Sequence, residues 1–271
     1  MYRLPGLSRK AAAAVVELAE QEFPDWHRPV GRPRKLTLVE ALRLTLCRLR
    51  RNATYNDLHE DFSIGCTTAW DYHQEMVAFL ADVLGCTGAA LSAQVTGKIC
   101  LIDGTLIPTF NWRHRTDLLS GKHRRRGVNA QLLVDVHGRI IGVSDAFPGS
   151  WHDIHCLREA GWVDMIPHCG AAAADLEYEG APGVVIPIKK KRGIELTDRE
   201  REFNTKFAKI RVAVEWGVAH AKNWRILCTR YRSDLCRIDA DIQAVVGLQK
   251  LNEQLVERSL TFDRIKATVS E

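Results

Sequence analysis

The segment Ile99-Cys100-Leu101-Ile102-Asp103-Gly104-Thr105 decides the fold class of this chain. Its four apolar residues are typical of a short strand that ends at an aspartate. A second small, apolar run, Ala171 to Ala174, ends in the same way at Asp175. Carboxylates at the ends of neighbouring strands can converge on one point, and hard divalent cations prefer oxygen ligands. An aspartate that only caps a turn is the alternative at each position.

The segments around these two strands alternate between strand and helix patterns. Further strands are predicted at 128–134, 139–144 and 184–188, a turn at 135–138, a short helix at 154–159, and longer helices at 197–228 and from 239 to about 256. Three strands that favour antiparallel pairing, then a helix, further strands and further helices make an α/β arrangement of the ribonuclease H kind.

A third carboxylate, Glu215, lies on the predicted helix 197–228. Successive helical residues are about 100° apart, so Arg211, Glu215 and Lys222 fall within about 40° of one another. Valines flank Glu215, and a glutamate on a partly apolar surface needs a partner, an ion or water. Arg211 and Lys222 can bind phosphates. The alternative is an ion pair on a solvated helix face.

The N-terminal part of the chain is predicted to be helical. A helix is expected from Ser8 to about Glu22, and the three prolines between 24 and 33 then exclude a continuous helix. Thr37 is expected to cap the next helix, with arginines on the face opposite its apolar stripe. The stripe comprises Leu38, Ala41, Leu42, Thr45, Leu46 and Leu49, and the arginines are Arg43, Arg48, Arg50 and Arg51.

A helix-turn-helix is predicted at about 54–79. An amphipathic segment from Thr54 ends in the turn Ser63-Ile64-Gly65, and a second helix begins at Cys66. Trp70 is expected to point inward, and the DNA-facing residues are expected to be Thr67, Thr68 and Asp71. A plain helical bundle is the alternative. Small, loop-like residues then mark a domain boundary, which divides the chain into residues 1–92 and 93–271.

Three basic clusters lie in predicted loops and are candidates for phosphate contacts. They comprise Arg28, Arg32, Arg34 and Lys35; Lys122, Arg124, Arg125 and Arg126; and Lys189 to Arg192. The segment from Gly31 to Lys35 is similar to the core of an AT-hook, an extended arm that fits the minor groove. A plain basic linker is the alternative.

Bulk composition favours an ordinary folded protein. The chain has 271 residues, 46% hydrophobic and 26% charged residues, and a net charge of +5. The apolar runs are too short to span a bilayer, and no signal peptide is recognised. The eight cysteines form no Cys-x-x-Cys pair, so reduced thiols in the cytoplasm, near the nucleoid, are expected.

Several motifs in order resemble those of the DDE transposases of small bacterial insertion sequences, in the group related to Harbinger elements. The motifs are Asp103-Gly104-Thr105, Ser120-Gly121-Lys122, Pro148 to Asp153, Ala174-Asp175 with Tyr178 and Gly180, and Arg211-(3)-Glu215-(6)-Lys222 followed by Trp224-Arg225-Ile226. Two positions depart from the family pattern: Ala208 replaces a tyrosine, and Leu176-Glu177 replaces Lys-Gly.

The resemblance implies that Asp103, Asp175 and Glu215 are the catalytic carboxylates and hold two Mg²⁺ or Mn²⁺ ions. It also implies double-stranded DNA as substrate and a homodimer or larger assembly on that DNA. Lys122, Arg124, Arg125, Arg211 and Lys222 are expected to contact DNA. His152 and Asp153 are expected beside the active site rather than as a zinc site with His155.

Two alternatives to a transposase remain at this point. One is a nuclease or resolvase of the same fold without strand transfer. The other is a domesticated or inactive transposase that acts as a DNA-binding protein, although retention of all three acids argues against it.

Overall fold

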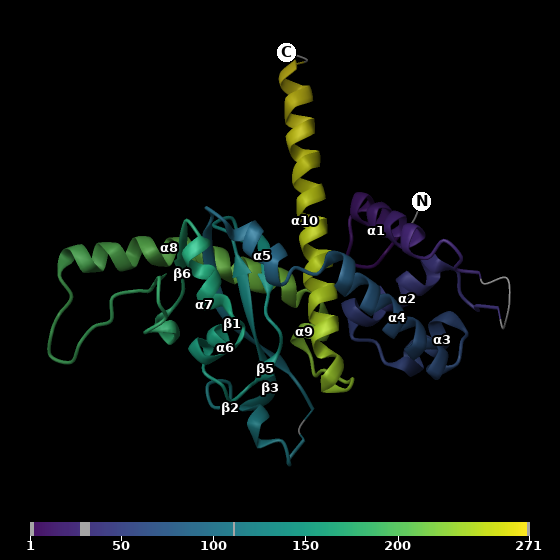
Figure 1. The fold of residues 1–271 in the computed structure, drawn as a ribbon, viewed down its shortest axis with the longest axis horizontal. Helices are drawn as coiled ribbons and strands as arrows, with labels where there is room; N and C mark the ends of the chain where they lie inside the picture. The colour runs from purple at the N-terminus through teal and green to yellow at the C-terminus, as the bar shows by residue number, and fades with distance from the viewer. Residues whose placement is uncertain (1–2, 28–32, 111, 270–271) are drawn as a thin grey trace. The chain divides into compact units, whose positions relative to one another are not determined.

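The computed structural model describes residues 3–27, 33–110 and 112–269, and it divides into two compact units (Figure 1). One unit comprises Met1–Gly85 with Asn223–Glu271, and the other comprises Cys86–Lys222. This division differs from the predicted boundary at residue 92, which placed 223–271 with the α/β domain. Those residues belong to the helical unit because the last helix packs along the helix that precedes Gly85.

The α/β unit is built on one mixed sheet, in the strand order β2-β3-β1-β6-β7, with β4 and β5 also paired to β3. The strands are β1 (Ile99–Pro108), β2 (Leu119–Ser120), β3 (Arg125–Val134), β4 (Ile140–Val143), β5 (Phe147–Pro148), β6 (Ala171–Ala173) and β7 (Val184–Val185). β1 is antiparallel to β3 and parallel to β6, and β6 is parallel to β7. The predicted α/β, ribonuclease H-like fold is thereby confirmed.

β1 is longer than its sequence pattern predicted, and Asp103 therefore lies within the strand rather than after it. The antiparallel partner β3 continues the pairing past Asp103, which faces Leu132, as far as Pro108 and Gly127. Asp175 does follow its strand, and its carboxylate caps the 3₁₀ turn Leu176–Tyr178 by accepting a 2.8 Å hydrogen bond from the Glu177 amide.

The helix α8 (Asp198–Lys222) packs against β1 and β3. Gly217 permits the close approach, since a Cβ there would lie 2.4 Å from Val134 Cγ1. α8 ends at Lys222, whereas one helix was predicted through Cys228; a separate helix, α9 (Arg225–Cys228), begins after Trp224. The remaining helices of the α/β unit are α5 (Gly88–Val95), α6 (Asp153–Glu159) and α7 (Trp162–Met165).

The helical unit contains α1 (Arg9–Glu22), α2 (Leu38–Arg51), α3 (Tyr55–Phe62), α4 (Cys66–Leu84) and α10 (Ile238–Val269), together with α9. Ser8, Thr37 and Thr54 cap α1, α2 and α3, and the last two form capping boxes with Glu40 and Asp57. The predicted apolar stripe of α2 is buried throughout.

Two side chains of the helical unit lie where the sequence did not predict them. Arg48, expected on a solvated face, is 1% exposed; it donates a 2.9 Å hydrogen bond to Ser233 Oγ and stacks over the Tyr55 ring. Trp70, expected to be buried, is 37% exposed and lies under the Arg237 guanidinium. α4 instead buries the row that contains Ala69 and Tyr72, because α4 packs on α2 and α10.

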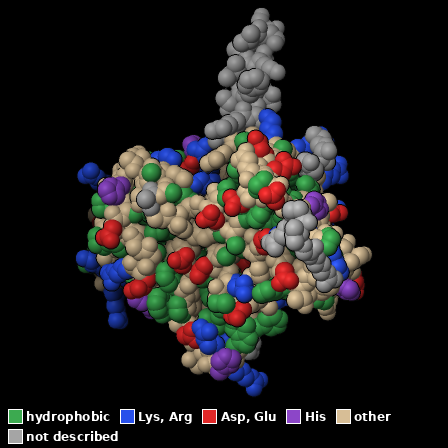
Figure 2. Space-filling view, turned by 45° about the vertical axis from the view of Figure 1, so that its right-hand side comes forward, with side chains coloured by type: hydrophobic (Ala, Val, Ile, Leu, Met, Phe, Trp, Pro, Cys, Tyr) green, Lys and Arg blue, Asp and Glu red, His purple; other side chains and the backbone are tan. Residues whose placement is uncertain are grey.

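Charged side chains of both signs are interspersed with apolar ones over the face shown in Figure 2. All eight cysteines are free thiols. Among the described residues, no helix combines the length and the apolar composition that crossing a membrane requires.

Candidate active site

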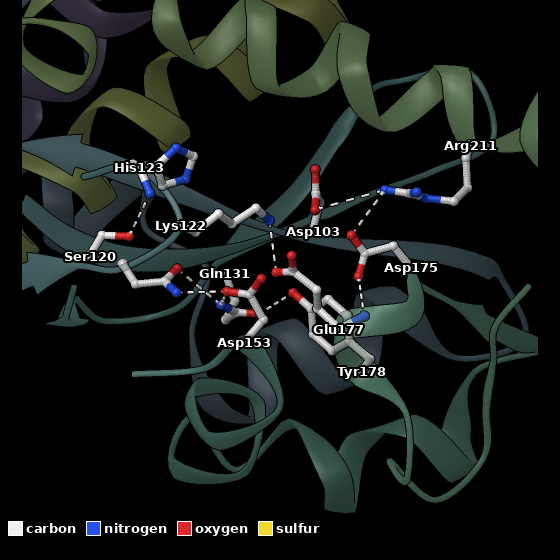
Figure 3. Close-up of polar contacts among 11 residues, drawn as sticks. Asp103, Ser120, Lys122, His123, Gln131, Asp153, Asp175, Glu177, Tyr178 and Arg211 are labelled. Carbon is white, nitrogen blue, oxygen red and sulfur yellow. Dashed lines mark hydrogen bonds and ion pairs between the residues drawn. The ribbon is translucent and has the colours of Figure 1, made fainter. Parts of the chain in front are cut away.

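Asp103 and Asp175 both lie beside the guanidinium of a single arginine in the α/β unit (Figure 3). One nitrogen of Arg211, on α8, lies 3.9 Å from Asp103 Oδ1 and 4.0 Å from Asp175 Oδ2. These two oxygens are therefore at most about 8 Å apart. Parallel pairing of β1 with β6 produces this meeting, because it carries both aspartates to the same region of the sheet.

The Asp103 carboxyl lies in an environment that disfavours its ionised form. Burial raises its pKa to about 7; Arg211 acts in the opposite direction, and the charges of Asp175, Glu215 and Asp153 add to the increase. Desolvation and like charges both disfavour the ionised form, so a cation bound here would relieve a strong electrostatic cost.

Glu215 lies one helical turn after Arg211 on α8 and is exposed. Its charge reaches Asp103, where it contributes to the raised pKa. Lys222, at the end of the same helix, is half-buried, and its charge helps to lower the pKa of His123, after burial and the charges of Lys122 and Arg125. α8 thus supplies the arginine that lies between the aspartates and a glutamate whose charge acts on Asp103.

The oxygen ligands present suit a hard divalent cation such as Mg²⁺. Among the described residues, however, no three His, Cys, Asp or Glu side chains are grouped closely enough to hold a metal together. Arg211 supplies the positive charge between Asp103 and Asp175 in this arrangement. The donor chemistry fits the expected metal, and Asp103 and Asp175 are the two carboxylates already brought together around one cation.

A buried polar network lies beside the two aspartates. Asp153 Oδ1 accepts a 2.6 Å hydrogen bond from Asn129 Nδ2 and a 3.5 Å bond from Gln131 Nε2, and Tyr178 donates its hydroxyl to Gln131 Oε1. The Asp153 carboxylate packs against Gly104, where a Cβ would lie 2.2 Å from Oδ1. Gly104 is therefore required for Asp153 to approach the strand that carries Asp103.

Lys122 extends from the loop between β2 and β3 towards the acids (Figure 3). Its ammonium lies 2.7 Å from Glu177 Oε2. Burial lowers the pKa of Lys122, but the hydrogen bond to Glu177 and the charges of Glu177, Asp153 and Asp175 outweigh burial and raise this pKa. The family departure at Glu177 therefore adds a carboxylate that pairs with this lysine.

Two family models match this chain. Residues 102–250 match the family described as DDE superfamily endonuclease, and residues 34–86 match the helix-turn-helix of DDE superfamily endonuclease. The chain belongs to the DDE superfamily endonucleases. Both ribonuclease H-like and helix-turn-helix predictions are thereby confirmed.

Two curated relatives cover most of this endonuclease. One, from Streptomyces albus G, is described as a transposase for insertion sequence element IS112; it is 28% identical over 251 residues, which are 91% of each chain. The other, from Microchaete diplosiphon, is described as a transposase for element IS702; it is 21% identical over 257 residues, again 91% of each chain.

The predicted DNA contacts of the endonuclease's helical unit have different environments. Thr67 and Asp71 are exposed on α4, Thr68 is half-buried, and Lys35 is exposed. These four positions have accessible surface. Arg32 lies outside the described residues.

Arg34 does not fit a free DNA-binding arm. Its guanidinium makes two hydrogen bonds to Glu75, of 2.5 and 2.7 Å, and lies 3.7 Å from the centre of the Trp26 ring. Tyr72 Oη accepts hydrogen bonds from the backbone amides of Lys35 and Leu36. These contacts fasten this part of the proposed AT-hook to α4.

The other basic and histidine candidates of the endonuclease are separated by the fold. Arg124 adopts a left-handed backbone conformation (φ 49°) in the turn before β3, and Arg125, predicted in a loop, begins that strand. His152 is exposed at the N-cap of α6, and His155 lies against the Trp151 ring. Of His152, Asp153 and His155, only Asp153 is buried.

Asn129 and Gln131 were not predicted as site residues, and Tyr178 was recognised only as part of a motif. Asn129 and Gln131 alternate within an otherwise apolar strand, so they occupy one face of β3. Two amides on the same face of a buried strand need polar partners, and this signal could have indicated a polar network.

Proposed function

We propose that this endonuclease is the transposase of an insertion sequence, which cuts DNA at the ends of its element and joins the free 3′-hydroxyl to target DNA. The observation that carries the proposal is the convergence of Asp103 and Asp175 on Arg211, with Glu215 one turn away on α8. The helix-turn-helix and the two transposase relatives support it.

In this proposal Asp103, Asp175 and Glu215 hold two Mg²⁺ or Mn²⁺ ions. Bound ions of this kind activate a water or a 3′-hydroxyl and stabilise the departing oxygen of a phosphodiester. The protein's own contribution is positional: strand β1 fixes Asp103, and the turn after β6 fixes Asp175. Arg211 and Lys122 supply positive charge for DNA phosphates, and Lys222, Arg124 and Arg125 extend this basic surface.

Recognition of the element ends is assigned to α4, with Thr67, Thr68 and Asp71 facing the bases and Lys35 contacting the backbone. Arg32 keeps its proposed role in the arm, whereas Arg34 serves to anchor that arm to Glu75. Because two ends must be held together, the active assembly is proposed to be a homodimer or larger.

The decisive experiment replaces Glu215 by Gln. This change keeps the side chain's shape but removes the charge that a metal needs, so cleavage of end-containing DNA in Mg²⁺ should fall by at least about a thousandfold. Binding of the ends, measured in Ca²⁺, should persist. Glu202→Gln is the matched control, because Glu202 is an exposed glutamate on the same helix that pairs with Lys206.

The choice of DNA substrate distinguishes a transposase from a nuclease. A duplex with a free end and a target plasmid reports joining, so cleavage without joining would indicate a nuclease rather than a transposase. Cleavage and joining by the Glu215→Gln protein at the rate of the Glu202→Gln control would show that Glu215 is not a metal ligand.

A further inference from the structure

A cavity of about 560 Å³ lies next to Asp103 in the α/β unit. Its lining comes from β1 at Gly104, from the loop 120–123, from the loop 149–152, and from the start of α6 at Asp153. The volume falls within the range of sites that hold a drug-sized organic molecule, roughly 300–1,000 Å³. Neither aspartate of the proposed metal site lines it, so the cavity is a neighbouring space and not the metal site itself.

Asp153 gives this cavity a charged acceptor. The residue is 6% exposed, and both of its hydrogen bonds go to Oδ1. Oδ2 accepts no hydrogen bond from the described residues, yet it is not among their fully enclosed unpartnered atoms. Since Asp153 lines the cavity, this oxygen is available to a ligand there. A carboxylate oxygen that opens into a cavity can accept a hydrogen bond from a ligand there.

Two other walls differ in chemistry from Asp153. The indole of Trp151 is half-buried at the cavity and is held by stacking on Phe147, with ring centres 5.7 Å apart. Lys122 also lines the cavity, and its ammonium pairs with the exposed carboxylate of Glu177. An apolar aromatic wall, a cation and a buried acceptor are thus combined in one space.

A nucleotide satisfies all three walls. Its phosphate can replace Glu177 as the ion-pair partner of Lys122, and its base can lie along the Trp151 indole. An exocyclic amino group of the base can donate a hydrogen bond to Asp153. A metal ion fits less well, because no three His, Cys, Asp or Glu side chains among the described residues are grouped closely enough to hold one.

We propose that the cavity beside Gly104 receives one nucleotide of the DNA, next to the phosphate to be cut, with Asp153 accepting a hydrogen bond from the exocyclic amino group of its base. This inference rests on the proposed function, since it places the DNA at Asp103. Taking a base out of the helical stack costs a few kcal/mol. The cavity contacts offset that cost and hold the strand in register with the carboxylates.

The test is a double-mutant cycle, which combines a change in one enzyme residue with the removal of one DNA base. End-containing duplexes are prepared with an abasic nucleotide at each position around the scissile phosphate, and affinity is measured in Ca²⁺. At one position the abasic change should weaken wild-type binding about tenfold, the scale of one base contact. Asp153→Asn should weaken binding to intact DNA by a similar factor. On that abasic DNA the same substitution should weaken binding no further. Thymine, which lacks an exocyclic amino group but can still lie along the indole, should show no coupling to Asp153→Asn and should keep its coupling to Trp151→Leu.

Trp151→Leu provides a second variant at the cavity, in case the loss of the Asp153 charge disturbs the fold, and it should show the same coupling. Asp164→Asn, an exposed carboxylate on α7, is the matched control, whose effects should simply multiply with those of the abasic change. The proposal is overturned if the effects of both cavity variants multiply with those of the abasic change at every position.

DNA binding in Ca²⁺ and DNA cleavage in Mg²⁺ are measured separately in this experiment. Coupling without cleavage in Mg²⁺ would retain the nucleotide site and reject the transposase function. Cleavage and joining without coupling would support the transposase function and reject the nucleotide site.

Discussion

At the scale of single residues, Asp103 carries an electrostatic cost that should be visible in stability. Its carboxyl holds a proton in the folded chain up to about pH 7, but loses it near pH 4 when unfolded. The unfolded state therefore deprotonates first, and the free energy of unfolding falls as pH rises through this window. Above pH 7 the full cost is present.

Asp103→Asn removes this cost, so the variant should unfold at a temperature a few degrees higher than the wild type at pH 8 in EDTA. At pH 4 the two proteins should differ little, because the aspartic acid is then neutral. Thermal unfolding by calorimetry measures the difference, with Asp164→Asn as the exposed control. A difference that does not grow between pH 4 and pH 8 would contradict the assignment of the raised pKa to Asp103.

At the scale of elements, α4 has one face that is buried in the helical unit and another that is exposed. Ala69, Tyr72 and His73 are buried in the helical unit, whereas Thr67 and Asp71 are exposed near the start of the helix. An exposed N-terminal turn is the part of a recognition helix that reaches base edges in the major groove. Arg34, bound to Glu75 on the same helix, braces the chain that leads to α2.

Replacing Thr67 and Thr68 together by Ala should weaken binding to element ends by about tenfold or more and leave binding to random DNA nearly unchanged. Lys35→Ala offers the contrasting control: a phosphate contact should weaken both DNAs alike and reduce the salt dependence of binding by about one charge. Fluorescence anisotropy at several salt concentrations measures both effects. Equal losses on the two DNAs for the threonine variant would show that these residues do not read sequence.

At the scale of the whole molecule, the two compact units differ in how the chain builds them. The α/β unit is continuous from Cys86 to Lys222 and has its own core, which includes Ile102, Leu133 and Trp162. The helical unit draws on both ends of the chain. Its last helix approaches α4 so closely that a Cβ at Gly247 would lie 2.6 Å from Leu84 Cβ.

A fragment of residues 86–222 should therefore fold by itself, whereas residues 1–92 should not. The N-terminal fragment lacks α10, which packs against α1 and α4 and accepts a 2.8 Å hydrogen bond from the Ser8 amide at Asn252. Circular dichroism with thermal melting measures cooperativity in each fragment. Residues 1–85 joined to 223–269 by a Gly/Ser linker form the control and should melt cooperatively; a cooperative melt of 1–92 would contradict this division.

The sequence by itself determined those features that depend on near neighbours. The cap at Thr37 was predicted, and the helix starts near Ser8 and Thr54 were indicated, because a cap bonds within three residues. The acids at 103 and 175 were identifiable because each follows an apolar run, and the family was identifiable from motifs in order. Periodicity along α2 likewise indicated its buried stripe.

Only the tertiary structure decided what depends on distant partners. Asp153 meets Asn129 across 24 residues, and Tyr178 meets Gln131 across 47. Arg48 is buried because Ser233, 185 residues away, accepts its hydrogen bond, and α10 belongs to the helical unit because α4 offers it an apolar face. Periodicity describes which face of an element is apolar, but not which other element covers it, and that choice sets the length of β1 and the environment of Asp103.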